Sequence, residues 1–542
     1  MTMTFIDYAC IVAFVALVLG VSMFMSRQKK DAAGYFLAGR GATWWLIGFS
    51  LIAANISTEQ FVGMSGAGAG NVGLAIASYE WIAAVTLVFV GIFFLPRFLS
   101  AGIFTIPEYL EYRYNQGARI IMSLFLMVIY VCVTIVAVVY SGGLTLHAIF
   151  DWDLRMSIWI IGILAAAYTT FGGLKAVIWA DLIQGSALIL GGALVLFLGL
   201  HAMAPDQGLL MGWSNFMDHA GDKMHMSLAL DHPELPVSAL FLGIWIPNFY
   251  YWGLNQYITQ RTLASRSLRE GQKGVMFAAF LKLLIPFVIV VPGIMALYLY
   301  PAELGGAEDT AKDAAYPVLI RHLIPEGLRG FMLAALAGAV MSSLASMLNS
   351  ASTIFTMDFF KRYIKPDAAE GQLVLVGRIT TVLFVVIGCL IAPMLADPKF
   401  GGVFHYIQDF QGFISPGILT AFVFGLIIKR TPATAAIAAM VANVPIYGLL
   451  HFASVQTAIV KAMPFLGAMN EEGAGSIAFL NQMAITGICL IIVMAVVTAI
   501  RPLKEPVVMP RNEAFDMEKS KIAPFIGVLI IAVTITLYYI FW

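Results

Sequence analysis

Long apolar runs alternate with short polar connections along almost the whole chain. A run of about 20 mainly apolar residues can cross a hydrocarbon layer of about 30 Å as a helix. Such runs occur at residues 5–26, 44–70, 73–96, 118–147, 156–172, 175–203, 237–261, 271–300, 328–360, 372–396, 403–426, 432–453, 475–500 and 522–541. The pattern predicts an all-α integral membrane protein with fourteen transmembrane helices.

The positions of the basic residues fit fourteen alternating spans. If the N-terminus is outside the cell, 23 of the 31 Lys and Arg residues lie in or beside cytoplasmic connections, and seven lie in or beside external ones. The remaining basic residue, Lys282, is inside a span. Because Lys and Arg are enriched in cytoplasmic connections, we expect both termini to be outside.

Composition also places the chain in a bilayer, since 60% of its residues are hydrophobic and only 11% are charged. The formal net charge of zero gives no indication of a nucleic-acid partner. The four cysteines lie inside apolar runs, without the spacing of a metal site or a disulfide framework. No connection is long enough to form a soluble domain with its own core.

Polar residues and glycines interrupt the second apolar run. Asn55, Ser57 and Gln60 lie in its middle, and glycines recur between Gly63 and Gly70. Gly weakens a helix, and lipid offers no partners to polar groups. We expect a broken helix whose exposed backbone carbonyls form an ion and substrate site at mid-depth, as transporters commonly use.

A second interruption is expected in run 237–261, where Pro247 removes a backbone donor and Gly253 weakens the turn beyond it. The two interrupted runs are five spans apart and therefore have opposite directions. Broken helices at matching positions indicate inverted repeats around a central site. The expected divisions are 1–43 (first helix and cytoplasmic loop), 44–203 (first repeat), 204–236 (external loop), 237–426 (second repeat) and 427–542 (three peripheral helices).

Three of the ionisable residues within apolar runs are candidates for a role in chemistry. Lys282 is near the middle of its span, and Glu80 is about seven residues from an external end. Ionised groups at such depth are costly unless they are paired or line water, so both are candidate site residues. Asp181 lies nearer the cytoplasmic end, where a role with an ion, a contact with the interface or a bond to a neighbouring helix would each explain it.

Hydroxyl groups recur on one helical face of run 328–360, at Ser342, Ser343, Ser346 and Ser350. Small residues at this spacing are typical of helix packing. Alternatively, one or two hydroxyls complete a sodium shell with carbonyls of the broken helix, because Na⁺ is a hard cation that prefers oxygen ligands. The stripe by itself does not decide between these two interpretations.

A set of amide, acid and amine side chains is spread over five spans. Such groups bind polyhydroxylated ligands, while aromatic rings cover the apolar faces of the ligand. A zwitterionic amino acid also tolerates a Glu and Lys pair, so these residues leave the substrate class open. The polar set is Asn55, Gln60, Glu80, Asn248, Lys282 and Gln408, and nearby rings are Tyr79, Trp81, Tyr250, Tyr251 and Trp252.

Ordered motifs cover nearly the whole chain. They are Phe36-Leu-Ala-Gly-Arg40, Trp44-Trp45, Ser50-Leu-Ile-Ala-Ala-Asn-Ile-Ser57, Ala77-Ser-Tyr-Glu-Trp81, Tyr250-Tyr-Trp-Gly-Leu-Asn-Gln-Tyr-Ile-Thr-Gln-Arg261, Ser342-Ser-Leu-Ala-Ser-Met-Leu-Asn-Ser350 and Ser415-Pro-Gly417. Together they resemble the sodium/solute symporter family, and within it the bacterial sodium/galactose branch related to animal sodium/glucose cotransporters.

The resemblance implies a LeuT-like core of two inverted five-helix repeats with two broken helices. It implies a sodium site formed by the backbone carbonyls of Ala53, Ile56 and Ala339 with the hydroxyls of Ser342 and Ser343, and it puts Asp181 near the sodium exit path. The positions that match the family's sugar-binding residues are Gln60, Glu80, Asn248, Lys282 and Gln408, with Asn55 nearby as the link to the ion site. Tyr251 matches the ring that closes the cytoplasmic side.

Two positions depart from the family pattern. Ala83 replaces a Ser that sugar-transporting relatives place one turn after the Glu, so the preferred sugar epimer stays open. Ala345 lacks the hydroxyl found in members that bind a second sodium, which favours one sodium per cycle.

The resulting hypothesis is sodium-driven symport of a galactose- or glucose-class monosaccharide across a bacterial inner membrane by alternating access. The same machinery carrying an amino acid or a carboxylate, such as proline, is the nearer alternative. A membrane sensor without net transport is a more distant one. An enzyme is not expected, because the sequence has no metal-ligand cluster or pairing of nucleophile and base.

Overall fold

The computed structural model describes residues 4–25, 32–57, 59–150, 152–304, 312, 314–396, 403–470, 472–513 and 515–542. Helices account for most of them, and several helices begin at side-chain caps that the sequence supplies. Asn115, Asp153 and Ser267 each accept a hydrogen bond from the backbone N–H three residues later. Such caps satisfy N–H groups that lack a partner in the first helical turn.

The first group of elements ends at Lys223, before a long connection that reaches Val237. They are α1 (Phe5–Met25), α2 (Ala32–Leu37), η1 (Ala38–Arg40), α3 (Trp44–Asn55), η2 (Glu59–Met64), α4 (Ser65–Ala69), η3 (Gly73–Ala77), α5 (Ser78–Phe89), η4 (Val90–Phe94), α6 (Leu95–Ala101), α7 (Ile106–Arg113), α8 (Gln116–Ile129), η5 (Tyr130–Thr134), α9 (Ile135–Phe150), α10 (Leu154–Met203), α11 (Leu209–Ala220) and η6 (Gly221–Lys223).

The remaining elements include one short antiparallel strand pair. They are α12 (Val237–Phe241), α13 (Trp245–Leu254), α14 (Gln256–Leu263), α15 (Leu268–Leu299), α16 (Pro301–Leu304), α17 (Ala315–Leu323), α18 (Leu328–Ile354), η8 (Phe355–Ile364), α19 (Glu370–Ile391), η9 (Ala392–Ala396), α20 (Val403–Gly412), α21 (Ser415–Ile427), α22 (Ala433–Leu449), α23 (Ala453–Ala462), η11 (Pro464–Leu466), β1 (Ala468–Met469), β2 (Gly475–Ser476), α24 (Phe479–Ile500) and α25 (Ala523–Ile540).

Within the described residues, nine helices are long and apolar enough to cross a membrane, and the number rises to 11 if each of two bent pairs is one span. The bent pairs are Tyr406–Gly412 with Ser415–Ile427 and Ala433–Leu449 with Ala453–Ala462. The α3 helix is apolar but too short to count alone. A multi-span helical membrane protein is therefore confirmed, whereas the number fourteen remains a prediction.

The second apolar run is broken as the sequence predicts. The α3 helix ends at Asn55, and Ile56 adopts extended backbone angles (φ −80°, ψ 101°) before η2 resumes the helix. The second interruption is also present, but it falls at Asn255 (φ −75°, ψ 122°), between α13 and α14. Pro247 does not break the chain, because it lies in the first turn of α13, where its missing N–H has no helical partner to lose.

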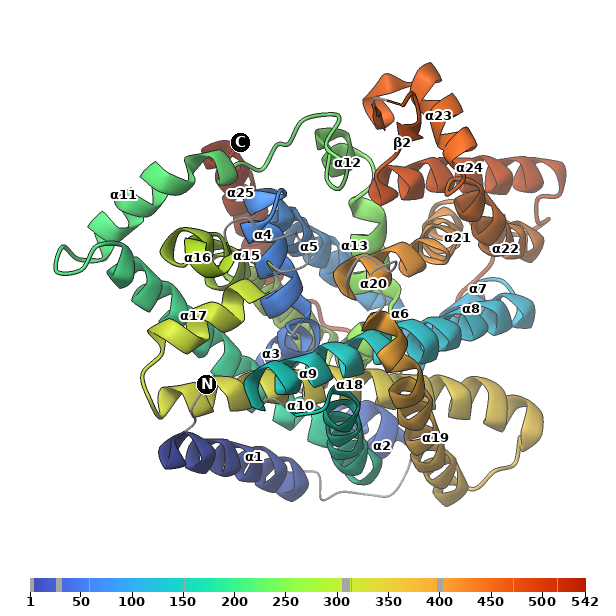
Figure 1. Cartoon of the computed structure of the whole chain (residues 1–542). Coiled ribbons are helices and arrows are strands. Elements are labelled where there is room, and N and C mark those ends of the chain that lie inside the picture. The colour runs from blue at the N-terminus through green and yellow to red at the C-terminus, as the bar shows by residue number, and fades with distance from the viewer. Residues whose placement is uncertain are drawn as a thin grey trace.

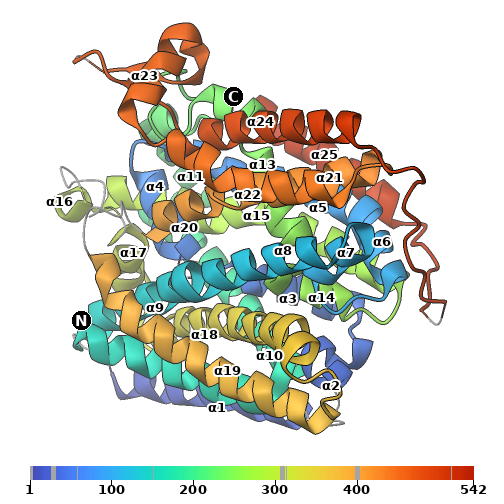
Figure 2. The same cartoon turned by 90° about the vertical axis from the view of Figure 1, so that its right-hand side faces the viewer.

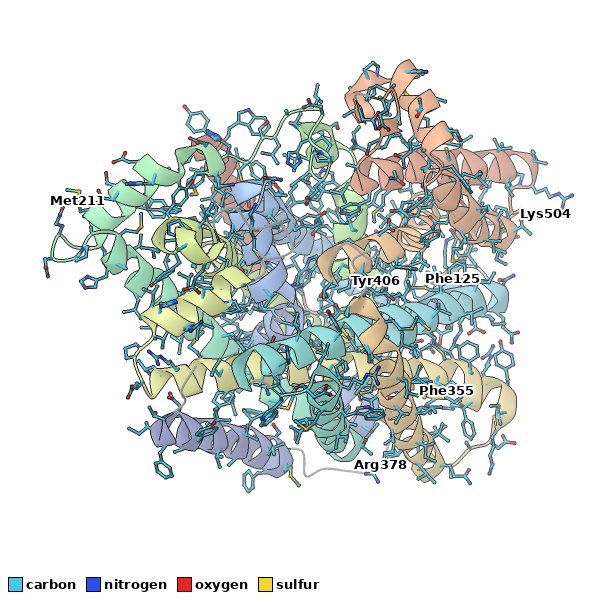
Figure 3. All side chains as sticks on the ribbon, in the orientation of Figure 1. Phe125, Met211, Phe355, Arg378, Tyr406 and Lys504 are labelled. Atoms are coloured by element: carbon cyan, nitrogen blue, oxygen red, sulfur yellow. The ribbon has the colours of Figure 1, made fainter. Side chains whose placement is uncertain are left out.

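The central packing joins helices that are distant in sequence. The α3 helix contacts α15, α10 and α18, while α1 lies at the periphery against α10 and α18 (Figure 1). In Figure 2, α24, α22 and α21 run side by side next to α8. Side chains drawn on the ribbon place Met211 and Lys504 at the outer margins and Tyr406 among the central helices (Figure 3).

The long α10 element contains two expected spans joined at Gly173. Gly173 has a positive φ of 58°, and a Cβ at this position would lie 2.7 Å from the carbonyl oxygen of Tyr35. Glycine therefore fits both the left-handed backbone and the close approach of α2. The bend brings the second part of α10, which carries Asp181, against α3 and α18.

Candidate functional site

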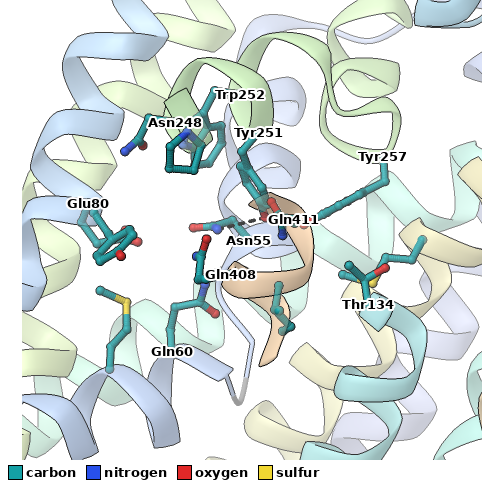
Figure 4. A pocket seen from close by; sticks show the side chains of 15 residues that line it. Asn55, Gln60, Glu80, Thr134, Asn248, Tyr251, Trp252, Tyr257, Gln408 and Gln411 are labelled. Atoms are coloured by element: carbon teal, nitrogen blue, oxygen red, sulfur yellow. Dashed lines mark hydrogen bonds between the residues drawn. The ribbon is translucent and has the colours of Figure 1, made fainter. Parts of the chain in front are cut away.

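A cavity of about 680 Å³, including its opening to solvent, lies between the two broken helices. Its wall mixes amides, a carboxylate and aromatic rings with a few apolar side chains (Figure 4). The lining residues are Asn55, Gln60, Met64, Tyr79, Glu80, Thr134, Pro247, Asn248, Tyr251, Trp252, Tyr257, Met347, Ile407, Gln408 and Gln411.

Asn55, the last residue of α3, is hydrogen-bonded to side chains from two other helices of this site. Its Oδ1 accepts a hydrogen bond from Lys282 Nζ, and its Nδ2 donates to the Tyr251 hydroxyl at 3.0 Å (Figure 4). Tyr257 donates to the same Tyr251 oxygen at 2.5 Å. The end of the first broken helix is therefore bonded to Tyr251, before the break in the second, and through Tyr251 it is linked to Tyr257 beyond that break.

Glu80 and Lys282 form a buried ion pair beside the cavity. The Lys282 ammonium is fully buried and contacts Glu80 Oε2 as well as Asn55. It also lies 4.9 Å from the centre of the Trp252 ring, within range of a cation–π contact. Glu80 lines the cavity, whereas Lys282 lies behind it, so the lysine reaches the cavity through its partners.

Gln60, Asn248 and Gln408, three of the predicted substrate-binding residues, all line the cavity. Gln60 Oε1 accepts from the backbone N–H of Ser57 at 3.0 Å and so bridges the break. Asn248 Nδ2 donates to the carbonyl of Ile244 at 2.9 Å, which leaves its Oδ1 as the group for a ligand. The buried Gln408 Oε1 has no hydrogen-bond partner among the described residues.

The break also exposes backbone oxygen atoms. The N–H of Ser57 bonds to Gln60 instead of the carbonyl of Ala53, so that carbonyl lacks its usual helical donor. Ser343 Oγ donates to the adjacent Ala54 carbonyl at 3.1 Å, and Ser342 lies one residue earlier on the same buried helix. The α3 helix packs against α18, so the predicted sodium ligands Ala53 and Ala339 belong to two helices that are in contact.

Asp181 bonds neighbouring helices and does not reach the membrane interface. The side chains of Asp181 and Arg261 are both fully buried and 3.0 Å apart. Ser50 and Ser342 each donate a hydroxyl to Asp181, and Arg261 also bonds to Ser346. The Arg261 guanidinium therefore lies in the helical core.

Gln411 and Tyr257 line the cavity but were absent from the predicted set, whereas Trp252 was among the predicted rings. Gln411 follows Gln408 by three residues and so shares its helical face, a spacing that could have identified it. Tyr257 and Trp252 lie on either side of the break at Asn255. Their motif was visible in the sequence, but the direction of each ring depends on how the second broken helix bends.

A sequence model of the sodium:solute symporter family matches residues 35–442. A sodium/glucose cotransporter of Vibrio parahaemolyticus is 44% identical over 86% of this chain and 88% of its own length. A symporter of Escherichia coli K12 named YidK and described as uncharacterized is 36% identical over 94% of this chain and 86% of its own length. The human sodium/myo-inositol cotransporter 2 is 33% identical over 78% of this chain and 66% of its own length.

Solved structures share the fold at lower sequence identity. A Na⁺-coupled sialic acid symporter in a substrate-bound, outward-open state aligns with a TM-score of 0.76 at 22% identity, covering 93% of this chain and 99% of that chain. MHP1, a nucleobase-cation-symport-1 family transporter, aligns with a TM-score of 0.51 at 16% identity, covering 89% and 98%. These likenesses concern the arrangement of the helices.

Proposed function

The chain belongs to the sodium:solute symporter family, and from this premise we propose that it moves a galactose- or glucose-class monosaccharide across a bacterial inner membrane together with sodium. The family's members are secondary transporters and not enzymes, and the ion they couple to is sodium. The observation that carries the proposal is the position of Asn55. This residue ends the broken helix whose Ala54 carbonyl accepts a hydrogen bond from Ser343 of α18, and its side chain borders the polar cavity.

In the proposed cycle, sodium binds the carbonyls of Ala53, Ile56 and Ala339 and the hydroxyls of Ser342 and Ser343. Binding fixes the end of α3, and the fixed helix end orients Asn55 and Gln60 toward the sugar. Sodium and sugar then favour the same conformation, and the shared preference is the coupling free energy. The reciprocity of such coupling means that sugar must also raise the affinity for sodium.

The proposed sugar contacts are Gln60, Glu80, Asn248 and Gln408, with Lys282 acting on the sugar side through Glu80 and Asn55. These groups offer both donors and acceptors, as a neutral ligand with many hydroxyls requires. The rings of Trp252 and Tyr79, which line the cavity, cover the apolar faces of the sugar in this proposal. Tyr251 is proposed to close the cytoplasmic side, because its hydroxyl is tied to Asn55 and leaves when the end of α3 loosens.

Asp181 is proposed to line the sodium exit path, since its carboxylate accepts a hydrogen bond from the hydroxyl of Ser342. The wider topology proposed is the one expected from the sequence: fourteen spans, two inverted five-helix repeats and both termini outside. One sodium per cycle is proposed because Ala345 offers no hydroxyl oxygen for a second ion.

Uptake into proteoliposomes tests the proposal. We expect labelled galactose or glucose to accumulate when an inward sodium gradient is imposed, and not when potassium replaces sodium on both sides. Uptake that is the same with and without the sodium gradient would overturn the proposal.

The nearer alternative is an amino acid or carboxylate as substrate, which the buried Glu80–Lys282 pair could also accommodate. Competition with an unlabelled panel of hexoses, proline and small carboxylates separates these cases. A sensor without transport would bind a member of the panel but show no flux.

A further inference from the structure

A row of three polar side chains on α22 faces the bend between α20 and α21. Asn443, Tyr447 and His451 recur every four residues, so they share one helical face. His451 lies in the turn just after α22 ends at Leu449. The facing helices α20 and α21 are bent by 48° relative to each other, and α20 carries the cavity residues Gln408 and Gln411.

Asn443 holds both ends of this bend. Its Nδ2 donates to the carbonyl of Gly412, the last residue of α20, at 3.1 Å. Its Oδ1 accepts from the N–H of Gly417, in the first turn of α21, at 2.9 Å. Both are backbone groups that a helix end leaves without a partner. A Cβ at Gly412 or Gly417 would collide with α22, so glycine at both positions permits the close approach.

Tyr447 and His451 hold α20 one turn earlier, at Asp409. The Tyr447 hydroxyl donates to Asp409 Oδ1 at 3.1 Å, and His451 Nε2 is 3.0 Å from the same oxygen. The Phe413 ring, at the bend, lies against His451 with ring centres 5.5 Å apart. Asp409 is flanked on its own helix by Gln408 and Gln411, so a bond to Asp409 fixes the turn that carries both amides.

The geometry around His451 favours its protonated form. While Nε2 faces Asp409, Nδ1 lies 3.0 Å from the Tyr447 carbonyl, so both ring nitrogens face acceptors. Only the imidazolium donates from both nitrogens, and a neutral ring would lose one of these bonds.

Other titratable groups near His451 are few in the described part of the chain. Asp409 faces it from α20 and Tyr447 from its own element, and Tyr79 lies near Tyr447. The packed helices α21 and α24 contain no charged side chain. Arg119 lies near the start of α8, and its guanidinium is bonded to Asp358 of η8.

We propose that Asn443, Tyr447 and His451 are positioning residues that clamp the bend of α20 and α21, and that protonation of His451 sets how firmly Gln408 and Gln411 are held for the sugar. The inference rests on the proposed function. The contribution of His451 is present while the ring is protonated and is lost when a rising pH removes the proton. Sugar affinity should therefore fall as the solution becomes more alkaline.

Equilibrium binding of labelled galactose to the purified full-length protein, at saturating sodium and from about pH 5 to about pH 9, tests the clamp. For the wild type we expect Kd to rise about two- to fivefold across the titration. This is the effect expected from the loss of one hydrogen bond between partly exposed charged groups. His451→Gln keeps a donor but does not titrate, so its Kd should be independent of pH. Asn443→Ala should raise Kd at every pH and keep the wild-type profile.

The matched control is His322→Gln, because His322 also faces a carboxylate, Glu303 at 2.7 Å, but lies away from the cavity. It should keep the wild-type profile. A wild-type Kd that does not change with pH, or a His451→Gln profile equal to that of the wild type, overturns the clamp while leaving sodium-driven uptake intact. If no sugar binds at all, the proposed function fails, and the clamp is then tested by thermal stability. The difference in Tm between the wild type and His451→Gln should change with pH. A difference that is constant with pH overturns the clamp.

Discussion

Two buried ion pairs in this symporter have the same kinds of charge but different surroundings. Glu80 borders the cavity, and its partner Lys282 also contacts Asn55 and the face of Trp252. Asp181 and Arg261 are enclosed by helices, and the serine hydroxyls around them complete their hydrogen bonds. A group next to open space can exchange a protein partner for a ligand of the size of a sugar, whereas a group enclosed by helices has no room for one.

The difference suggests separate roles for the two pairs. A buried pair is not in itself a strong source of stability, because desolvation offsets the attraction between the charges. Loss of one partner is costly only where the remaining charge has no access to water. We therefore expect substitutions at the enclosed pair to affect folding, and substitutions at the cavity pair to affect sugar binding.

The largest effect is expected for Arg261→Met. The substitution leaves the fully buried Asp181 carboxylate without its cation, which should lower the free energy of unfolding by about 3–5 kcal/mol. Denaturation in detergent measures this loss. The matched control is Arg269→Met, which breaks an exposed pair with Glu518 at 3.5 Å and should cost less than about 0.5 kcal/mol. Equal losses for the two variants would contradict the proposed division of roles.

Lys282→Met should act mainly on sugar binding. Removing the ammonium frees Glu80 and Asn55 from their set positions, and we expect Kd for the sugar to rise about 10- to 100-fold, as for loss of a hydrogen bond to a charged group. The loss of stability should be smaller than for Arg261→Met, because cavity water can solvate Glu80. Lys273→Met, on the same helix but away from the cavity, serves as the control. Sugar affinity unchanged in Lys282→Met would reject this role for the cavity pair.

Ser343→Ala separates the ion side of the site from the sugar side. Loss of one hydroxyl oxygen should raise the sodium concentration for half-maximal uptake about tenfold, while sugar affinity at saturating sodium stays near the wild-type value. Ser352→Ala is the control, since this buried hydroxyl on the same helix bonds to the carbonyl of Asn349. A change in sugar affinity alone would show that Ser343 belongs to the sugar side.

The smallest effect is expected for Trp252→Leu. This substitution removes the ring face over the Lys282 ammonium but keeps an apolar side chain, so sugar Kd should rise about threefold. Sugar binding by a variant that carries both Trp252→Leu and Lys282→Met, compared with each single variant, shows whether the two changes are additive. Full additivity would indicate that the ring acts independently of the lysine.

Much of the site was predictable because its signals are local. Polar residues inside an apolar run predicted a break in the second span, which the structure places after Asn55, and depth in the membrane marked Glu80 and Lys282 as candidates. The position of the second break was less predictable, since Pro247 disturbs a helix only beyond its first turn and the chain opens at Asn255 instead. Gln411 could have been found from its spacing, whereas the ring direction of Tyr257 could not.

The sequence by itself determined that the chain spans a membrane, that two of its helices are interrupted and that charged groups lie at depth, because each of these follows from the composition of one segment. Only the tertiary structure decided which groups meet. Arg261 lies 80 residues from Asp181, and Lys282 lies 202 residues from Glu80. Such pairings depend on which helices pack together, and helix packing is a property of the whole core and not of any one segment.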